Sequence, residues 1–310
     1  MLVSIIIPCY NVQEFISTSI LSALNQTYLE TEIICIDNNS TDNTSSILND
    51  FQIEFPKKII VLKESKKGAP AARNKGLAIA KGEWIQFLDA DDELMPDKIL
   101  NQVNFISNNP TIELIIASLI KNFVKRKQVL LESLDNVWIG AIVSRAGCTC
   151  SNLYKKSALE KINGWDEAKI SSQETWLLFS LLKQKCNVAV FHKAETIINE
   201  RVEGSITFNN RIGNWERYIV FREEIWEYLK SSGLLTPEIE TALKQSIFDS
   251  IRFSFIEDPK KAVSLYEKYV KEKFKPVESK VTGKHYLRIY NLIGFSILEN
   301  TKAIIGKYFK

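Results

Sequence analysis

Three carboxylates lie close together in Asp89-Ala90-Asp91-Asp92, directly after the apolar run at residues 84–88. A short apolar run with polar residues at its end predicts a buried strand. Carboxylates at positions i and i+2 that leave a strand can face one hard divalent cation together, and Mg²⁺ or Mn²⁺ sites are typically completed by water and a phosphorylated substrate. A second interpretation stays open, in which Asp91, Asp92 and Glu93 only cap the next helix.

The segments around this cluster alternate between strand and helix patterns. Apolar runs predict strands at 3–7, 32–37, 58–62 and 84–88, and helical spacing predicts helices at 15–24 and 70–80, with Ser40 or Thr41 capping another. Strands that alternate with helices form βαβ units and a largely parallel sheet. Because parallel strands point the same way, Pro8, Asp37 and Asp89 are expected along one edge, where open α/β sheets bind ligands.

The rest of the chain is less regular and then becomes helical. The patterns predict a helix at 112–124, a strand at 137–143, a loop at 147–150, an apolar helix at 176–182 and helices at 215–229 and 237–255. Cys148 and Cys150 have no paired Cys or His nearby, so they predict a buried loop rather than a zinc site. We place a domain boundary near 208, giving domains at 1–208, with halves at 1–100 and 101–208, and at 209–310.

Composition and charge narrow the class of protein. The 310 residues are 45% hydrophobic and 25% charged, which is ordinary for a globular protein. Forty basic against thirty-seven acidic residues give +3, so we expect no nucleic-acid partner. Most of the five cysteines sit in apolar runs, which favours a reducing compartment. The start of the chain lacks signal-peptide features, and no run reaches the ~18 apolar residues of a spanning helix, so we expect a cytoplasmic protein.

Five segments in order resemble the successive signature blocks of the family 2 glycosyltransferases: VSIIIPCYN at 3–11, ALNQTY at 23–28, EIICIDNNSTDNT at 32–44, GAPAARNKG at 68–76 and FLDADD at 87–92. GWDE at 164–167 and SQETW at 172–176 resemble the family's downstream markers. The resemblance covers about residues 1–206. It implies the glycosyltransferase-A fold, a Rossmann-like α/β fold with a mixed, mainly parallel sheet flanked by helices. It also implies a nucleotide-sugar donor, a divalent metal (Mn²⁺ or Mg²⁺) and inversion at the anomeric carbon.

The resemblance also implies roles for single residues on the donor side. It places Pro8 and Tyr10 by the base, Asp37 and Asn38 in the base and ribose pocket, Arg73 near the nucleotide, Asp89 on the ribose side, and Asp91 as the principal metal ligand. Asn38 stands where the family often has Asp, and an amide both donates and accepts hydrogen bonds. A UDP-sugar is the donor we favour, with GDP and dTDP forms left open.

Inversion requires a base on the face of the sugar opposite the leaving group. The resemblance implies that Glu174 fills this role, because Gln173-Glu174 matches the family's short motif at the start of an apolar helix. Many members have Asp there, and Ser180 stands where an Arg is common. Asp166 and Glu167 are alternative bases, and Glu174 could instead only cap its helix. Trp165, beside Asp166, is expected in the core rather than against a sugar ring.

The stretch at 284–310 carries five basic residues against one acidic residue, Glu299, among many apolar side chains. Two interpretations stay open: peripheral contact with the inner face of an anionic membrane, or a helix packed on the catalytic domain. Contact with a membrane would suit a lipid-linked acceptor.

Together these features predict an inverting, metal-dependent glycosyltransferase that moves a sugar to a glycan or lipid-linked acceptor in bacterial surface polysaccharide synthesis. The alternative is a catalytically silent nucleotide-sugar or carbohydrate binding protein on the same fold. A sugar-1-phosphate nucleotidylyltransferase would require a Gly-rich phosphate loop after the first strand, and Pro8-Cys9-Tyr10-Asn11 is not one.

Overall fold

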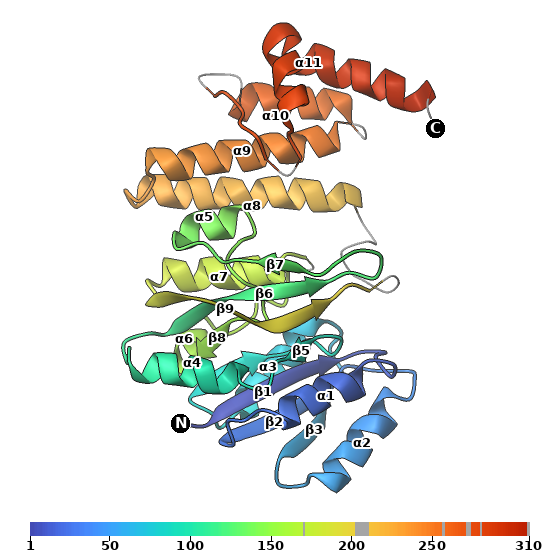
Figure 1. Ribbon diagram of the computed structural model, residues 1–310, viewed down its shortest axis with the longest axis vertical. Helices are drawn as coiled ribbons and strands as arrows, with labels where there is room; N and C mark the ends of the chain where they lie inside the picture. The colour runs from blue at the N-terminus through green and yellow to red at the C-terminus, as the bar shows by residue number, and fades with distance from the viewer. Residues whose placement is uncertain (170, 202–210, 256–257, 271–273, 280, 309–310) are drawn as a thin grey trace. The chain divides into compact units, whose positions relative to one another are not determined.

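The computed structural model describes residues 1–169, 171–201, 211–255, 258–270, 274–279 and 281–308 (Figure 1). The chain divides into two compact units, Met1–Gly204 and Ser205–Lys310. Each unit has hydrophobic clusters of its own. The boundary that we predicted near 208 falls outside the described residues.

One mixed sheet forms the centre of the first unit, and within the described residues it has nine strands. They are β1 (Val3–Cys9), β2 (Thr31–Asp37), β3 (Ile59–Lys63), β4 (Trp84–Phe87), β5 (Glu93–Leu94), β6 (Leu114–Asn122), β7 (Val129–Leu131), β8 (Leu153–Lys155) and β9 (Val188–Asn199). Their order is β3-β2-β1-β4-β8-β6-β9-β5, with β7 paired to β6. The four strands at the β3 end are parallel, and β8 is antiparallel to both neighbours.

Helices cover the sheet, as predicted. They are α1 (Ile16–Leu24), α2 (Thr44–Glu54), α3 (Ala69–Ile79), α4 (Lys98–Ser107), α5 (Val137–Ile142), α6 (Lys156–Lys161) and α7 (Gln173–Lys183). Along β1, Ile5 and Ile7 pack in a cluster with residues of α1, α2 and α4, whereas Ile6 packs in a second cluster with residues of α3, α6 and α7. Burial on both faces explains why this strand is a continuous apolar run rather than an alternating one.

Three local predictions are wrong. The run at 112–124 contains strand β6 instead of a helix, because an apolar run without clear periodicity fits either state and pairing with β8 and β9 decides. The run at 137–143 forms helix α5 instead of a strand, and the Asn136 side chain caps it by accepting from the Ile139 N–H at 3.1 Å. Neither Ser40 nor Thr41 caps α2, which follows Asn43.

The described part of the second unit is helical, as predicted. Its elements are α8 (Arg211–Ser231), α9 (Pro237–Ser254), α10 (Pro259–Tyr269) and α11 (Lys284–Tyr308). Their core gathers around Phe248, Phe255 and Phe295. Gly294 has φ 74° and breaks the helical conformation of α11 into two parts, a backbone state that glycine adopts at little cost. Among the described helices of the chain, none has both the length and the apolarity needed to cross a bilayer.

Candidate active site

Strand register brings the carboxyl ends of three strands to one edge of the sheet. Cys9 of β1 pairs with Asp37 of β2, and Ile6 of β1 pairs with Phe87 of β4, two residues before Asp89. The residues that end these strands therefore lie side by side, although they are up to eighty positions apart in sequence. This is the edge at which open α/β sheets bind ligands.

At the β1 end of this edge, the loops after β1 and β2 are joined by hydrogen bonds. The Oδ1 atom of Asn11 accepts from the Thr41 N–H at 2.8 Å, and the Asn11 N–H donates to Ser40 Oγ at 3.2 Å. The loops leave Tyr10 54% exposed at the surface, while Pro8 is half-buried within β1. The exposed ring of Tyr10 is therefore open to contact with a planar ligand.

Asp37 and Asn38 both hold loops in place. The carboxylate of Asp37 is 3% exposed and accepts from the Ser40 N–H at 3.0 Å and from Ser45 Oγ at 2.5 Å. The amide of Asn38 donates to the carbonyls of Glu64 and Lys66 and accepts from the Gly68 N–H. A carboxylate accepts only, so Asp at position 38 could not make the two donations. This explains the local departure from the family's Asp-Asp pattern.

Arg73 of α3 connects three distant segments. Its side chain is 7% exposed; Nη2 lies 2.6 Å from Asp89 Oδ1, and Nη1 donates to Gln173 Oε1 at 3.4 Å. The guanidinium carbon also lies 4.4 Å from the centroid of the Trp165 ring. The end of β4 and the start of α7 therefore meet at one buried cation.

The neighbouring Asn74 fixes the segment at 164–167. Its amide accepts from the Trp165 N–H and donates to the Trp165 carbonyl and to Glu167. Gly164 has φ +69°, and a Cβ there would lie 2.5 Å from Asn74 Oδ1, so a side chain would be strained and crowded. Trp165 is 3% exposed, which confirms that it belongs to the core.

The two alternative bases have local partners. Glu167 accepts from Asn74 and lies 2.5 Å from Lys66 Nζ, and these hydrogen bonds lower its pKa. Asp166 accepts from the Ala168 N–H at 2.9 Å, in the manner of a turn. The partners of both carboxylates are therefore Lys66, Asn74 and the Ala168 backbone, and these contacts do not connect either carboxylate to the acidic cluster after β4.

The acidic cluster leads into a strand and does not cap a helix. Glu93 and Leu94 form β5, and α4 begins only at Lys98, so the capping interpretation is wrong. Asp92 is 5% exposed and accepts from the Asn199 N–H at 2.9 Å and from the Cys150 thiol at 3.3 Å. Oxygen or sulfur atoms of Asp89, Asp92 and Cys150 lie within 4.8 Å of one another.

Charge repulsion within this cluster favours a cation. Desolvation raises the pKa of Asp91, and the charge of Asp89 raises it further, while Arg201 opposes the shift. Desolvation and the charges of Asp89 and Asp91 also raise the pKa of Asp92. A divalent cation would relieve this repulsion, and carboxylate oxygens are the ligands that Mg²⁺ and Mn²⁺ prefer. The carboxylates of Asp89 and Asp92 therefore fit such a metal, whereas Asp91 does not belong to their compact group and lies against Arg201.

Two residues at this cluster were missed by sequence reasoning. Arg201 Nη1 lies 3.5 Å from Asp91 Oδ2, and Cys150 bonds to Asp92. Arg201 follows β9 and belongs to none of the segments that resemble family motifs, so only the pairing of β9 with β5 and β6 could reveal its position. Burial raises the pKa of the Cys150 thiol, which keeps it protonated.

Glu174 lies in the first turn of α7, beside the Gln173 that Arg73 holds. Desolvation raises its pKa, a backbone hydrogen bond and Arg73 lower it, and Asp89 raises it again. These interactions place Glu174 within electrostatic reach of Arg73 and Asp89. The side chain of Glu174 is exposed to solvent, so a substrate can reach it.

Comparison with known proteins identifies the class. Residues 4–162 match the family model Glycosyl transferase family 2. This match covers about half of the chain, and the chain belongs to that family. By class it is a glycosyltransferase.

Particular relatives and structures agree with this assignment. The glucosyltransferase WfaP of Escherichia coli, named UDP-Glc:alpha-D-GlcNAc-diphosphoundecaprenol beta-1,3-glucosyltransferase, is 37% identical over 155 residues, which are 49% of this chain and 59% of that protein. The chain matches about half the length of WfaP and of a Haemophilus influenzae relative that is 42% identical over 109 residues.

Solved structures show that the fold is of the glycosyltransferase-A type. Staphylococcus aureus TarS in complex with UDP-GlcNAc aligns with a TM-score of 0.69 at 16% identity, over 97% of this chain and 91% of that one. The mannosyltransferase PcManGT of Pyrobaculum calidifontis, in complex with GDP-Man and Mn²⁺, aligns with a TM-score of 0.59 at 16% identity, over 97% and 86% of the two chains. At this identity the likeness concerns the fold alone.

Replacing Arg73 tests the connection between β4 and α7. Arg73→Met removes the guanidinium from Asp89 and Gln173, and we expect a loss of about 1–3 kcal/mol in the free energy of unfolding. Urea denaturation followed by circular dichroism measures this loss. Lys75→Met, at the exposed lysine two positions further along α3, is the control and is expected to change stability little. Equal stability of the two variants would contradict the role assigned to Arg73.

Proposed function

We propose that this protein transfers a sugar, with inversion, from a nucleotide diphosphate donor to a glycan or lipid-linked acceptor in bacterial surface polysaccharide synthesis, in a metal-dependent reaction. The observation that carries the proposal is the Arg73 connection, which joins Asp89 of the acidic cluster to Gln173 beside Glu174. This connection supports an arrangement in which the group that would bind the leaving diphosphate and the candidate base lie on either side of Arg73. The UDP-Glc donor of WfaP and the UDP-GlcNAc bound to TarS support a UDP-linked donor.

On the donor side, Asp91 would be the principal ligand of a divalent metal, with Asp89 beside it. When bound, such a metal neutralises the charge that builds on the leaving diphosphate. Arg201 lies next to Asp91, and its planar guanidinium matches phosphate oxygens, so we place it against the diphosphate as well. The Mn²⁺ in the PcManGT complex supports a metal at a site of this fold.

On the acceptor side, Glu174 would act as the base. Glu174 would take the proton of the acceptor hydroxyl while the hydroxyl oxygen bonds to the anomeric carbon. At the same time the bond between this carbon and the diphosphate oxygen would break, and its electron pair would stay on the diphosphate. Glu174 suits this step better than Glu167, because Lys66 and Asn74 already occupy Glu167 and lower its pKa.

Asp91→Asn tests the metal ligand. We expect a loss of about 100-fold or more in transfer, because a neutral amide no longer anchors the cation that offsets the leaving charge. A panel of UDP-, GDP- and dTDP-sugars, assayed for nucleotide release with Mn²⁺, Mg²⁺ or EDTA, measures it. Asp50→Asn, at an exposed acid of α2, is the control. If Asp91→Asn stayed active with unchanged metal dependence, a residue other than Asp91 would be the principal metal ligand.

The same assay distinguishes the alternative function. If the wild type bound a nucleotide-sugar donor without turning it over, the catalytically silent binding protein would be favoured.

Glu174→Gln tests the base. We expect transfer to fall by about 10²–10⁴-fold, since proton removal is lost, while thermal stabilisation by UDP stays unchanged. The ionised form acts as base and its pKa is raised, so wild-type transfer should decline as pH drops through that raised pKa. The variant should lack this acid limb. Glu54→Gln, at an exposed glutamate of α2, is the matched control. If Glu174→Gln were fully active, the base would have to be another residue.

Peripheral membrane contact through 284–310 is part of the proposal. Along α11, Ile289, Leu292 and Ile297 are exposed apolar side chains, and Arg288 and Lys302 are exposed cations. An apolar surface with basic residues suits an anionic membrane, here the inner face of the cytoplasmic membrane.

Flotation with lipid vesicles measures this contact. We expect the wild type to bind phosphatidylglycerol-containing vesicles and to bind pure phosphatidylcholine vesicles little. Leu292→Glu should remove most of the bound fraction, because it puts a negative charge on the surface that would insert. Leu234→Glu, at an exposed apolar residue between α8 and α9, is the control. Equal flotation of Leu292→Glu and wild type would exclude α11 as the contact.

A further inference from the structure

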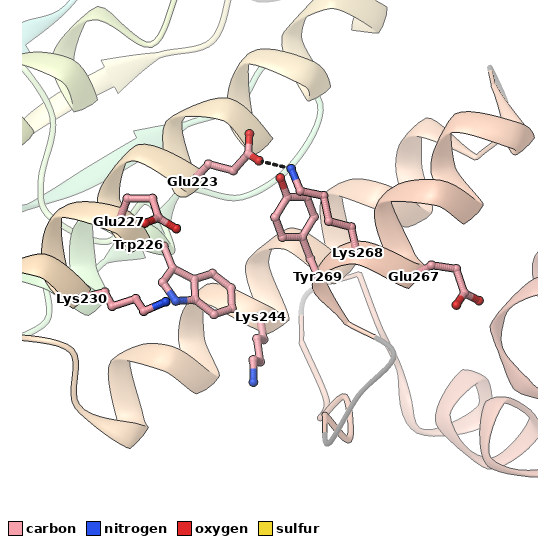
Figure 2. A pocket seen from close by; sticks show the side chains of 8 residues that line it. All are labelled: Glu223, Trp226, Glu227, Lys230, Lys244, Glu267, Lys268 and Tyr269. Atoms are coloured by element: carbon pink, nitrogen blue, oxygen red, sulfur yellow. Dashed lines mark hydrogen bonds and ion pairs between the residues drawn. The ribbon is translucent and has the colours of Figure 1, made fainter.

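The second unit contains a pocket of about 410 Å³ formed by α8, α9 and α10 (Figure 2). This volume lies in the range of small-molecule sites, roughly 300–1,000 Å³. Two aromatic side chains line the pocket, Trp226 of α8 and Tyr269 of α10, together with six charged residues, of which Glu267 points away from the two rings in Figure 2. All of the lining residues belong to the second unit, and none of them belongs to the acidic cluster at the sheet edge.

The aromatic rings are anchored on the core of the unit. Trp226 and Tyr269 are both partly buried and pack against the cluster that contains Phe248 and Val270. Each residue therefore has one side held by apolar neighbours while it also borders the pocket. Aromatic rings fixed in this way offer rigid apolar surfaces at low entropic cost to a ligand that has both C–H groups and hydroxyls.

The charged residues of the pocket balance one another. The acids are Glu223, Glu227 and Glu267, and the bases are Lys230, Lys244 and Lys268. Lys268 Nζ lies 2.9 Å from Glu223 Oε1, an ion pair drawn in Figure 2, and 4.4 Å from the centroid of the Tyr269 ring. A phosphate would require surplus positive charge and a metal ion surplus negative charge. Equal numbers of acidic and basic side chains beside aromatic rings suit a neutral, polyhydroxylated ligand instead.

We infer that this pocket binds a neutral segment of oligosaccharide and so supplies a second glycan contact, outside the catalytic unit. The inference rests on the proposed function, because it takes the acceptor to be a glycan. Trp226 would pack against a sugar ring, and the carboxylates and ammonium groups would bind its hydroxyls.

Calorimetric titration of the full chain with neutral tetrasaccharides of glucose, galactose, mannose, N-acetylglucosamine and N-acetylgalactosamine tests the inference. We expect at least one of them to bind, and Trp226→Ala to weaken its affinity roughly tenfold or more, as for buried aromatic contacts at binding sites. Trp226→Phe should retain part of the affinity because it keeps a ring. Leu234→Ala, an exposed apolar residue of the same unit outside the pocket, should bind as the wild type does. Circular dichroism confirms that each variant is folded.

Two results would overturn the pocket's role: no tetrasaccharide binds the wild type, or folded Trp226→Ala binds as tightly as the wild type. Nucleotide release from UDP-, GDP- and dTDP-sugars with Mn²⁺, measured on the same samples, separates this inference from the proposed function. Turnover without oligosaccharide binding refutes the pocket alone. Trp226-dependent oligosaccharide binding without turnover supports the pocket and refutes the proposed transfer.

Discussion

The buried guanidinium of Arg73 needs a counter-charge, and Asp89 provides it from the end of β4 at 2.6 Å. An isolated charge in this position would be costly, so the pair fixes where α3 can lie relative to the sheet edge. The same guanidinium reaches Gln173, which positions the start of α7 and the adjacent Glu174. The candidate site depends on this contact, because it is the point at which the donor-side and acceptor-side segments meet.

Asparagine amides hold the loops around this site. The Asn11 side chain hydrogen-bonds the loop after β1 to the loop after β2, and the Asn38 side chain hydrogen-bonds the loop after β2 to the segment before α3. The Asn74 side chain hydrogen-bonds α3 to the segment before α7. An amide can donate and accept at once, and all three asparagines bond to backbone groups whose positions then vary little. The carboxylates of Asp89 and Asp91 lie at the same edge beside Arg73 and Arg201, and burial together with these two carboxylate charges raises the pKa of Asp92.

The two proposed ligand sites differ in the balance of their charged side chains. At the sheet edge, Asp91 and Asp92 have raised pKa values because of burial and neighbouring carboxylates, as suits a metal and a diphosphate. In the helical unit, acids and bases are equal in number around Trp226, as suits a neutral sugar. The charges of the two proposed sites would in this way distinguish an anionic donor from a neutral segment of the acceptor glycan. Each proposed site lies in a unit with hydrophobic clusters of its own.

The sequence by itself determined the strands β1, β2, β3 and β4, because each is a short apolar run, and it determined the family through motifs of fixed order. It also indicated that Asp37 and Asp89 lie at one edge, since parallel strands share a direction. Tertiary structure alone decided that the run at 112–124 is a strand, because pairing with β8 and β9 overrides an ambiguous pattern. Only the tertiary structure placed Arg201 beside Asp91 and Cys150 beside Asp92, which are contacts across 110 and 58 positions of the chain. The physical reason is that local spacing carries no information about which distant side chains the packed sheet brings together.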